Sequence, residues 1–281
     1  MAPAPFFGDL GKTARDVLYG GRDGVYQYSN VVSLSTKTAD GMDFVLKGVQ
    51  KEDAFVPEVK ATYDNPHFKL VTSLAQASGK VGLALTGKKV VPGLNVTLSG
   101  SLPDVGSGKL GLEYVVPHVS LKAGSTLSAT PLMDVAVTSN VDVKGRDLVV
   151  GGQGSYDAAK GLVSSWKVGF GYAALDYQVA ATFSDKKDVS ALIAHSVTPD
   201  VTVGAEIVRN LDSAETSMAA GVARRLPSGA LQKVKVQHTG IVSVLHEQTL
   251  EGKSKLALSG QFDAKDLSKA PKYGVSVDFK Y

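Results

Sequence analysis

Four charged side chains near the start of the sequence are the first candidates for chemistry. Asp9, Lys12, Arg15 and Asp16 recur at the spacing that places them on one face of a helix. This face carries two cations and two carboxylates. A short, one-sided helix of this kind usually packs by its apolar face or anchors at a membrane surface, and it can also plug a lumen.

Motifs for catalysis or cofactor binding are incomplete in the rest of the chain. Residues 11–13 read Gly-Lys-Thr, as at the end of a phosphate-binding loop, but Phe6 occupies the position of the first glycine. Residues 169–174 match the dinucleotide pattern G-x-G-x-x-A, yet they lie within an alternating strand pattern that no helix follows. The 5 histidines lack the spacing of a metal site, and the chain has no cysteine. We therefore expect no catalytic residue, metal or cofactor and no specific nucleic-acid partner, and an enzyme remains only an alternative.

The elements that position these residues are almost all predicted to be β-strands. Apolar and polar residues alternate along short runs that end at Gly, Asp, Asn, Pro or Lys clusters. Breaks of two to six residues favour antiparallel hairpins. The 19 predicted runs are 25–37, 42–51, 55–63, 67–76, 80–87, 94–102, 107–115, 118–128, 131–142, 147–157, 163–173, 175–184, 187–197, 201–209, 215–226, 229–238, 241–250, 253–263 and 271–280.

The two faces of these strands indicate a membrane barrel. One set of alternating positions is apolar and aromatic, as at Trp166 and Phe170, whereas the other is small or carries lysine, as at Lys167 and Gly169. This apolar-out, polar-in pattern is typical of a transmembrane β-barrel, and about 13 residues per strand with its turn suit the tilted spans of such a barrel. A large soluble barrel or paired sandwiches remain the alternative.

Composition excludes a helical membrane protein without excluding a barrel. The chain has 281 residues, 43% of them hydrophobic, a net charge of +3 and a mean hydropathy of +0.03. No apolar stretch approaches the ~20 residues that a membrane-spanning helix needs. The first residues lack the features of a cleaved secretory signal, so we do not expect one.

The N-terminal segment departs from the strand pattern. We expect a short amphipathic helix from Phe6 to Leu18, with Asp9 as a cap or first-turn acid. Glycines should end the helix and supply a flexible hinge, at Gly20, Gly21 and Gly24. The expected packing face consists of Leu10, Ala14, Val17 and Leu18. The predicted domains are residues 1–24, the helix and its tether, and residues 25–281, the β-barrel pore.

Several stretches resemble the mitochondrial outer-membrane porins, or voltage-dependent anion channels. Residues 8–17, GDLGKTARDV, are similar to the helix that lies in the lumen of these channels, and residues 37–44, 146–152 and 171–185 carry further matches. Residues 272–279, KYGVSVDF, resemble the β-signal for barrel insertion, with its constrained positions at Lys272, Gly274, Val277 and Phe279. The resemblance implies a 19-stranded barrel, closed by a parallel pair, with the helix in its lumen.

The resemblance also implies roles for single residues. Lys12 and Arg15 match the basic positions assigned to anion and nucleotide contact and to gating, and Asp9 and Asp16 lie beside them. A second basic position of the family falls on Gly20, for which the nearby Arg22 can substitute. The membrane-facing glutamate of some members falls near residues 73 and 74, which are Ser and Leu, so its partner docking and calcium response are not predicted.

The resemblance and the strand pattern together predict the function. A 19-stranded barrel should have a lumen about 25 Å wide, which admits hydrated ions and nucleotides. Strand parity gives the lumen a basic wall: Lys47, Lys60, Lys109, Lys122, Lys167, Lys233, Lys235 and Lys255. Because salt screens such charges over about 8 Å, the anion preference should be weak.

We therefore expect a voltage-gated, weakly anion-selective channel that passes ions and metabolites such as ATP and ADP across the mitochondrial outer membrane. Membrane lipid and transported anions are its expected partners, with a possible homo-oligomer in the membrane. The alternatives are the protein-import pore of the same membrane, which usually has a longer N-terminal extension, and a soluble β-barrel binding protein.

Overall fold

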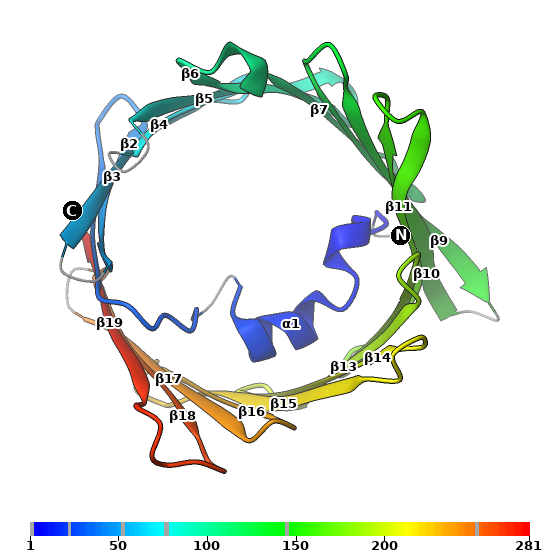
Figure 1. The fold of residues 1–281 in the computed structure, drawn as a ribbon. Coiled ribbons are helices and arrows are strands. Elements are labelled where there is room, and N and C mark those ends of the chain that lie inside the picture. The colour runs from blue at the N-terminus through cyan, green and yellow to red at the C-terminus, as the bar shows by residue number, and fades with distance from the viewer. Residues whose placement is uncertain (1–2, 22–23, 52–53, 76–78, 144–145, 251–252) are drawn as a thin grey trace.

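A closed barrel of 19 β-strands makes up most of the protein (Figure 1). The computed structural model describes residues 3–21, 24–51, 54–75, 79–143, 146–250 and 253–281. Consecutive strands pair antiparallel, and the barrel closes where β1 (Val31–Lys37) runs parallel to β19 (Lys272–Lys280). The predicted all-β architecture, its strand number and the parallel closure are confirmed.

The other strands follow one another around the wall in chain order, apart from the closing contact. They are β2 (Met42–Lys51), β3 (Ala54–Asp64), β4 (Phe68–Ala75), β5 (Lys80–Val91), β6 (Leu94–Leu102), β7 (Lys109–Val115), β8 (Val119–Thr126), β9 (Leu132–Val143), β10 (Arg146–Asp157), β11 (Leu162–Ala173), β12 (Tyr177–Ser184), β13 (Asp188–Thr198), β14 (Val201–Asn210), β15 (Thr216–Arg225), β16 (Leu231–Gln237), β17 (Ile241–Thr249) and β18 (Lys255–Asp263). The described helices are two 3-10 turns, η1 (Phe7–Asp9) and η2 (Val105–Ser107), and one α-helix, α1 (Lys12–Tyr19).

The strand register assigns each residue parity to one face of the wall. Lys167 pairs with Gln153 on β10 and with Ser184 on β12, so these three side chains share the lumenal face. Trp166 and Val168, the neighbours of Lys167 along β11, point outward and are 42% and 47% exposed. An apolar outer band of this kind is stable against lipid rather than water, as in a transmembrane barrel.

The N-terminal helix is shorter than predicted and is interrupted. η1 ends at Asp9 and α1 begins at Lys12, with Gly11 between them in a left-handed conformation at φ 71°. A Cβ at Gly11 would lie 2.8 Å from Leu192 Cδ1, so glycine permits both this turn and a close approach to the wall. Gly11 is the N-cap residue of α1 and no side chain caps that helix, so Asp9 is not its cap; Asp9 is instead the acidic residue in the single turn of η1.

The first strand also differs from its prediction, because it begins at Val31 rather than at residue 25. The residues just before Val31 pass over the lumenal side of β19. A Cβ at Gly274 would lie only 2.4 Å from the carbonyl oxygen of Gln27 and 2.6 Å from the amide nitrogen of Ser29. The alternation of residues 25–30 therefore reflects packing against the wall and not membership of a strand.

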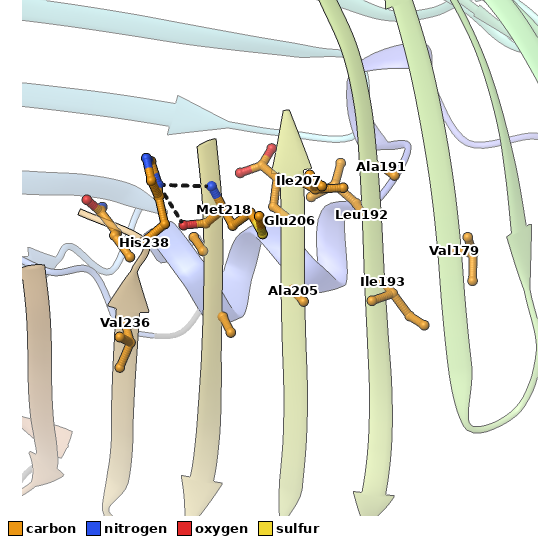
Figure 2. Close-up of a pocket in the computed structure, with 13 residues that line it drawn as sticks. Val179, Ala191, Leu192, Ile193, Ala205, Glu206, Ile207, Met218, Val236 and His238 are labelled. Atoms are coloured by element: carbon orange, nitrogen blue, oxygen red, sulfur yellow. Dashed lines mark hydrogen bonds between the residues drawn. The ribbon is translucent and has the colours of Figure 1, made fainter. Parts of the chain in front are cut away.

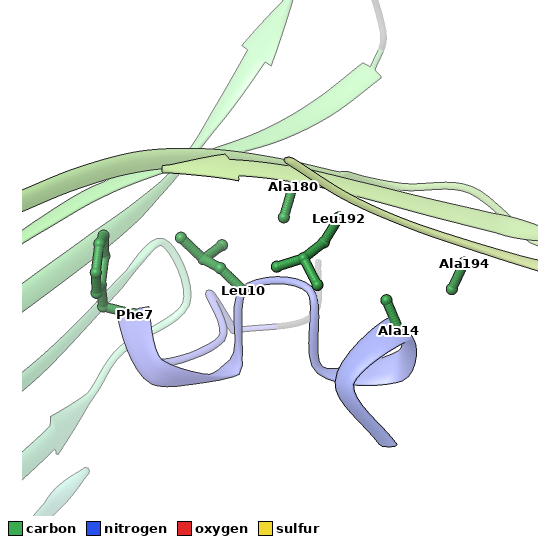
Figure 3. Packing of buried hydrophobic residues seen from close by; sticks show 6 residues of the cluster. All are labelled: Phe7, Leu10, Ala14, Ala180, Leu192 and Ala194. Carbon is green, nitrogen blue, oxygen red and sulfur yellow. The ribbon is translucent and has the colours of Figure 1, made fainter. Parts of the chain in front are cut away.

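A cluster of buried apolar residues lies inside the barrel, between the N-terminal residues and the wall. Figure 3 shows Phe7, Leu10 and Ala14 facing Ala180, Leu192 and Ala194 of β12 and β13. All six are less than 10% exposed. In Figure 1, α1 lies beside β13 to β16, and the lumen toward β4 to β7 is uncovered. No helix among the described residues is both long and apolar enough to cross a membrane.

Candidate pore-lining site

The N-terminal segment, which we define as described residues 4–21 and 24–30, is fixed at its start by two wall hydroxyls. Ser120 Oγ on β8 donates to the carbonyl oxygen of Ala4 at 2.5 Å, and Thr138 Oγ1 on β9 donates to that of Pro5 at 2.5 Å. Both hydroxyl residues are almost fully buried, at 1% and 0% exposure. Buried hydrogen bonds to backbone carbonyls hold this end of the segment against the wall.

Glycines on the lumenal face create room for the apolar side chains of the segment. A Cβ at Gly171 on β11 would lie 2.9 Å from Leu10 Cδ2, and one at Gly221 on β15 would lie 3.2 Å from Leu18 Cδ2. Gly204 on β14 lies under Val17, because a Cβ at this position would lie 3.2 Å from Val17 Cβ. The missing side chains form a shallow track across the wall.

The expected packing face of the helix lies on this track. Its four side chains are 0–4% exposed: Leu10, Ala14, Val17 and Leu18. Burying them against the wall stabilises the docked segment by up to about 1.5–3 kcal/mol for each large side chain. Gln178 of β12 adds a polar contact, because its Oε1 accepts the amide N–H of Thr13 at 3.2 Å.

The two basic residues of the helix differ in their surroundings. Lys12 is exposed to the lumen, and its ammonium lies 3.1 Å from Asp9 Oδ1. The Arg15 guanidinium instead donates to the carbonyl oxygens of Gly8 and Leu10, at 2.5 and 2.7 Å. Arg15 therefore stabilises the turn between η1 and α1. This structural role is additional to the predicted contact with anions.

Side chains of two strands, β14 and β16, bind the C-terminal end of α1. The Tyr19 hydroxyl donates to Glu206 of β14, and the Lys235 ammonium on β16 lies 4.9 Å from the Tyr19 ring centroid. Lys233 Nζ donates to the carbonyl oxygens of Asp16 and Gly24, at 2.8 and 3.0 Å. Burial raises the pKa of Tyr19, and the hydrogen bond and the charge of Glu206 raise it further. Tyr19 is therefore a neutral hydrogen-bond donor at physiological pH.

The predicted hinge glycines form a packed turn. Gly20 and Gly24 both have positive φ, at 82° and 64°, and a Cβ at Gly20 would lie 2.5 Å from the carbonyl oxygen of Gly24. A Cβ at Gly21 would overlap the carboxylate of Asp16. The tight approach requires glycine at these positions. Arg22 lies outside the described residues.

All eight lysines of the predicted basic wall lie at lumenal positions of the register. Lys233 and Lys235 are nevertheless only 3% and 7% exposed, because the N-terminal segment covers them. Lys235 lies between the rings of Tyr19 and Tyr26, 5.2 Å from the Tyr26 centroid. The sequence predicts that these two lysines line the open lumen. They instead lie under the N-terminal segment and bind it.

The other six wall lysines fall into two groups. Lys122 and Lys255 form ion pairs with Glu113 and Glu247, each at 2.8 Å. Among the described residues, four have neither an ion pair nor a side-chain hydrogen bond: Lys47, Lys60, Lys109 and Lys167. The uncompensated positive charge is therefore spread over β2, β3, β7 and β11.

The residues of the predicted insertion signal divide between the two faces of β19. Lys272 and Gly274 lie on the lumenal face, and Val277 and Phe279 point outward. Gly274 has a structural role that the signal motif does not explain, because the N-terminal segment crosses it. The described residues contain no cluster of His, Asp and Glu that could hold a metal ion.

Sequence reasoning missed most of the wall residues that bind the segment. Ser120, Thr138, Gln178 and Glu206 are ordinary polar residues of lumenal parity. Their role depends on which strands the helix lies against, and alternation alone does not reveal this. Lumenal glycines are the one signal that could have traced the track, because they recur on the strands under the helix.

Comparisons with known proteins agree with this architecture. The family model described as eukaryotic porin matches residues 3–274. A mitochondrial outer membrane protein porin 4 of Arabidopsis thaliana is 27% identical over 280 residues, which cover 99% of this chain and 98% of that protein. Porin 1 of Oryza sativa subsp. japonica is 28% identical over 282 residues and 100% of both chains, and the porin of 36 kDa of Solanum tuberosum is 28% identical over 279 residues, 98% of this chain and 97% of its own.

The family match spans nearly the whole barrel and includes the N-terminal segment that lies in its lumen. The resemblance noted from the sequence is thereby confirmed. The chain belongs to the eukaryotic porin family and is an integral channel protein of the mitochondrial outer membrane.

Proposed function

We propose that this porin is a voltage-gated, weakly anion-selective channel for inorganic ions and for metabolites such as ATP and ADP. The observation that carries the proposal is the set of four lumenal lysines without a carboxylate partner, Lys47, Lys60, Lys109 and Lys167. These cations attract anions along the open side of the lumen. A polyanion such as ATP can engage several of them at once.

Acidic side chains on the same face limit the preference. Glu58 lies opposite Lys47 in the register, and Glu113 neutralises Lys122. The helix adds no net charge, because Asp9 and Asp16 balance Lys12 and Arg15. With screening over about 8 Å at physiological salt, the selectivity for small anions is modest and decreases as salt rises.

For gating, the proposal assigns the moving part to the N-terminal segment. Docked, the segment is held by Lys233 and Glu206 at one end and by Ser120 and Thr138 at the other. Voltage shifts the segment or the nearby wall strands that hold it, and this movement narrows the lumen and lowers the anion preference. Residues 1–24 thus act as the gating unit and residues 25–281 as the pore.

Reversal potentials in planar bilayers under a salt gradient test the selectivity. Lys109→Glu with Lys167→Glu should shift the reversal potential toward the value of a cation-selective channel, because both substitutions replace an uncompensated positive charge in the lumen with a negative one. The matched control is Lys187→Glu, which lies in a hairpin outside the strands and is paired with Asp212 at 2.7 Å. The proposal fails if the double variant and the control have the same reversal potential as the native protein.

A further inference from the structure

The outer face of β12 to β16 carries an apolar groove that the channel function does not use. It is a cavity of about 510 Å³ that opens toward the surroundings of the barrel (Figure 2). Ala191, Ala205 and Ala220 form part of its lining, and larger apolar side chains border them, such as Ile193, Ile207 and Met218. Small residues between large ones make a depression in the outer surface. We call this depression the outer groove.

The strand register places a cation just beyond the lining of the outer groove, along β14. Glu206 binds Tyr19 inside the lumen, so Ile207 and Arg209, at the opposite parity of β14, point outward. Arg209 is the next outward residue after Ile207 and the second-last residue of its strand. It is exposed, and within the described part of the chain its guanidinium has no hydrogen bond or ion pair.

Full charges are rare on this face of the barrel. Among the paired outward positions whose side chains the structure describes, Asp, Glu, Lys and Arg occur only at Arg209 and Arg224, each next to a strand end. Burying an arginine side chain in lipid costs free energy, so the side chain extends toward the interface between membrane and water. A guanidinium beside the headgroup layer finds its best partner in a phosphate, which it binds with two parallel hydrogen bonds.

A second donor lies at the same end of the groove. The amide N–H of Met218 donates to Nδ1 of His238 at 3.1 Å, as the dashed lines in Figure 2 show. In the neutral ring this leaves Nε2 as the N–H donor. Lys265 also reaches this end, since its ammonium lies 3.0 Å from the carbonyl oxygen of His238. The polar end of the groove is therefore rich in donors and the rest is apolar.

We propose that the outer groove binds one anionic phospholipid, whose phosphate pairs with Arg209 and whose acyl chain lies over the alanines. The charge of Arg209 matches the headgroup, and the apolar lining matches the chain. The site depends on the barrel fold and its membrane location and not on conduction, so it can fail or succeed separately from the proposed channel function.

The position of the groove gives the lipid a consequence for the lumen. Gly204 and Gly221 contact the helix on the inner side of the wall. Ala205, which follows Gly204 on β14, and Ala220, which precedes Gly221 on β15, line the groove outside. The wall at this place is one backbone thick. A bound acyl chain therefore supports the same strands that hold α1.

Native mass spectrometry of the full-length protein, released from nanodiscs, tests the proposal. The nanodiscs contain equal amounts of phosphatidylglycerol and phosphatidylcholine with identical acyl chains. The native protein should retain one phosphatidylglycerol in preference to phosphatidylcholine. Arg209→Gln should weaken this preference about tenfold, because a charge-assisted pair is lost. Ala205→Phe, which fills the groove from outside, should reduce retention of both lipids.

Arg224→Gln is the matched control, because Arg224 also points outward but lies at the opposite rim, near the end of β15. It should retain lipid as the native protein does. Heat-modifiable migration in gels verifies that each variant is folded. The proposal is overturned by equal retention of the two lipids in the native protein, by equal losses in the Arg209 and Arg224 variants, or by a dimer sensitive to Ala205→Phe that carries no lipid.

Discussion

Lys233 should be the strongest single attachment between the N-terminal segment and the wall. Its side chain is 3% exposed, and its ammonium donates to the carbonyl oxygens of Asp16 and Gly24, on either side of the glycine turn. Lys233→Met keeps the length and the apolar stem of the side chain but removes the hydrogen bonds to these two carbonyl oxygens. We expect the variant to fold as a barrel with a segment that detaches far more often.

The hydrogen bonds to Asp16 and Gly24, both within the described residues, set a lower limit on the size of the effect. A hydrogen bond to a charged group contributes about 1.5–3 kcal/mol. When the segment of the native channel detaches, the two carbonyl groups and the ammonium of Lys233 are hydrated again. The lower value therefore applies to each hydrogen bond. The docked state should lose about 3 kcal/mol, which changes the ratio of docked to detached segment roughly a hundredfold. Because closure displaces the segment, the variant should close at lower voltage.

Spin-label mobility measures this detachment directly. The chain has no native cysteine, so Lys12→Cys provides a single labelling site on an exposed residue of the helix. The label should be slow in the otherwise native channel and fast in the Lys233→Met channel. Lys167→Met is the matched control, since it removes the same lumenal charge at a lysine that does not contact the segment. An immobile label in Lys233→Met, or equal mobility in the control, would show that Lys233 does not hold the segment against the wall.

Three further predictions concern the same segment. Val17→Cys with Gly204→Cys should form a disulfide on oxidation, because their Cβ atoms would lie 3.2 Å apart and a shift of the helix away from the wall by a few tenths of an ångström brings them to the usual range of about 3.5–4.5 Å; the oxidised channel should resist voltage closure in bilayer records, and reduction should restore it. Gly274→Ala should destabilise the barrel in heat-modifiability gels, because its Cβ would lie 2.4 Å from the carbonyl oxygen of Gln27; unchanged stability would contradict the close crossing. Since docking raises the pKa of Tyr19 above its usual 10.0, the contribution of Tyr19 to docking should be complete below about pH 10 and decrease above it as the detached tyrosine ionises; spin-label mobility should show this loss, and Tyr19→Phe should reduce it.

Much of the barrel could be predicted because each strand carries its own signal. Alternation is local, so β2 and β11 are visible in the sequence without knowledge of their neighbours. The same local signal misplaced the start of β1. Tyr26 and Tyr28 alternate with polar residues, but these residues pack on the inner face of the wall instead of joining it. Alternation of apolar and polar residues shows that the two sides of a segment face different surroundings. It does not distinguish a strand of the barrel from an extended segment that packs across the wall.

The candidate site could be predicted only in part. Amphipathicity identified the apolar face that includes Leu18, but the break at Gly11 arises from contact with Leu192, which is far away in the sequence. Parity identified Lys233 as lumenal, yet its burial depends on where the helix docks. Contacts between distant residues decide which lumenal lysine meets an anion and which one binds the segment. Local patterns do not contain this information.

The conductance of the purified protein in a planar bilayer, recorded during a voltage ramp under a potassium chloride gradient, tests the central claim most directly. We expect a large conductance at low voltage, a reversal potential of the sign that chloride preference gives, and a decrease in both conductance and anion preference as voltage rises. A channel that is cation-selective at low voltage, or that shows no voltage-dependent conductance, would contradict it.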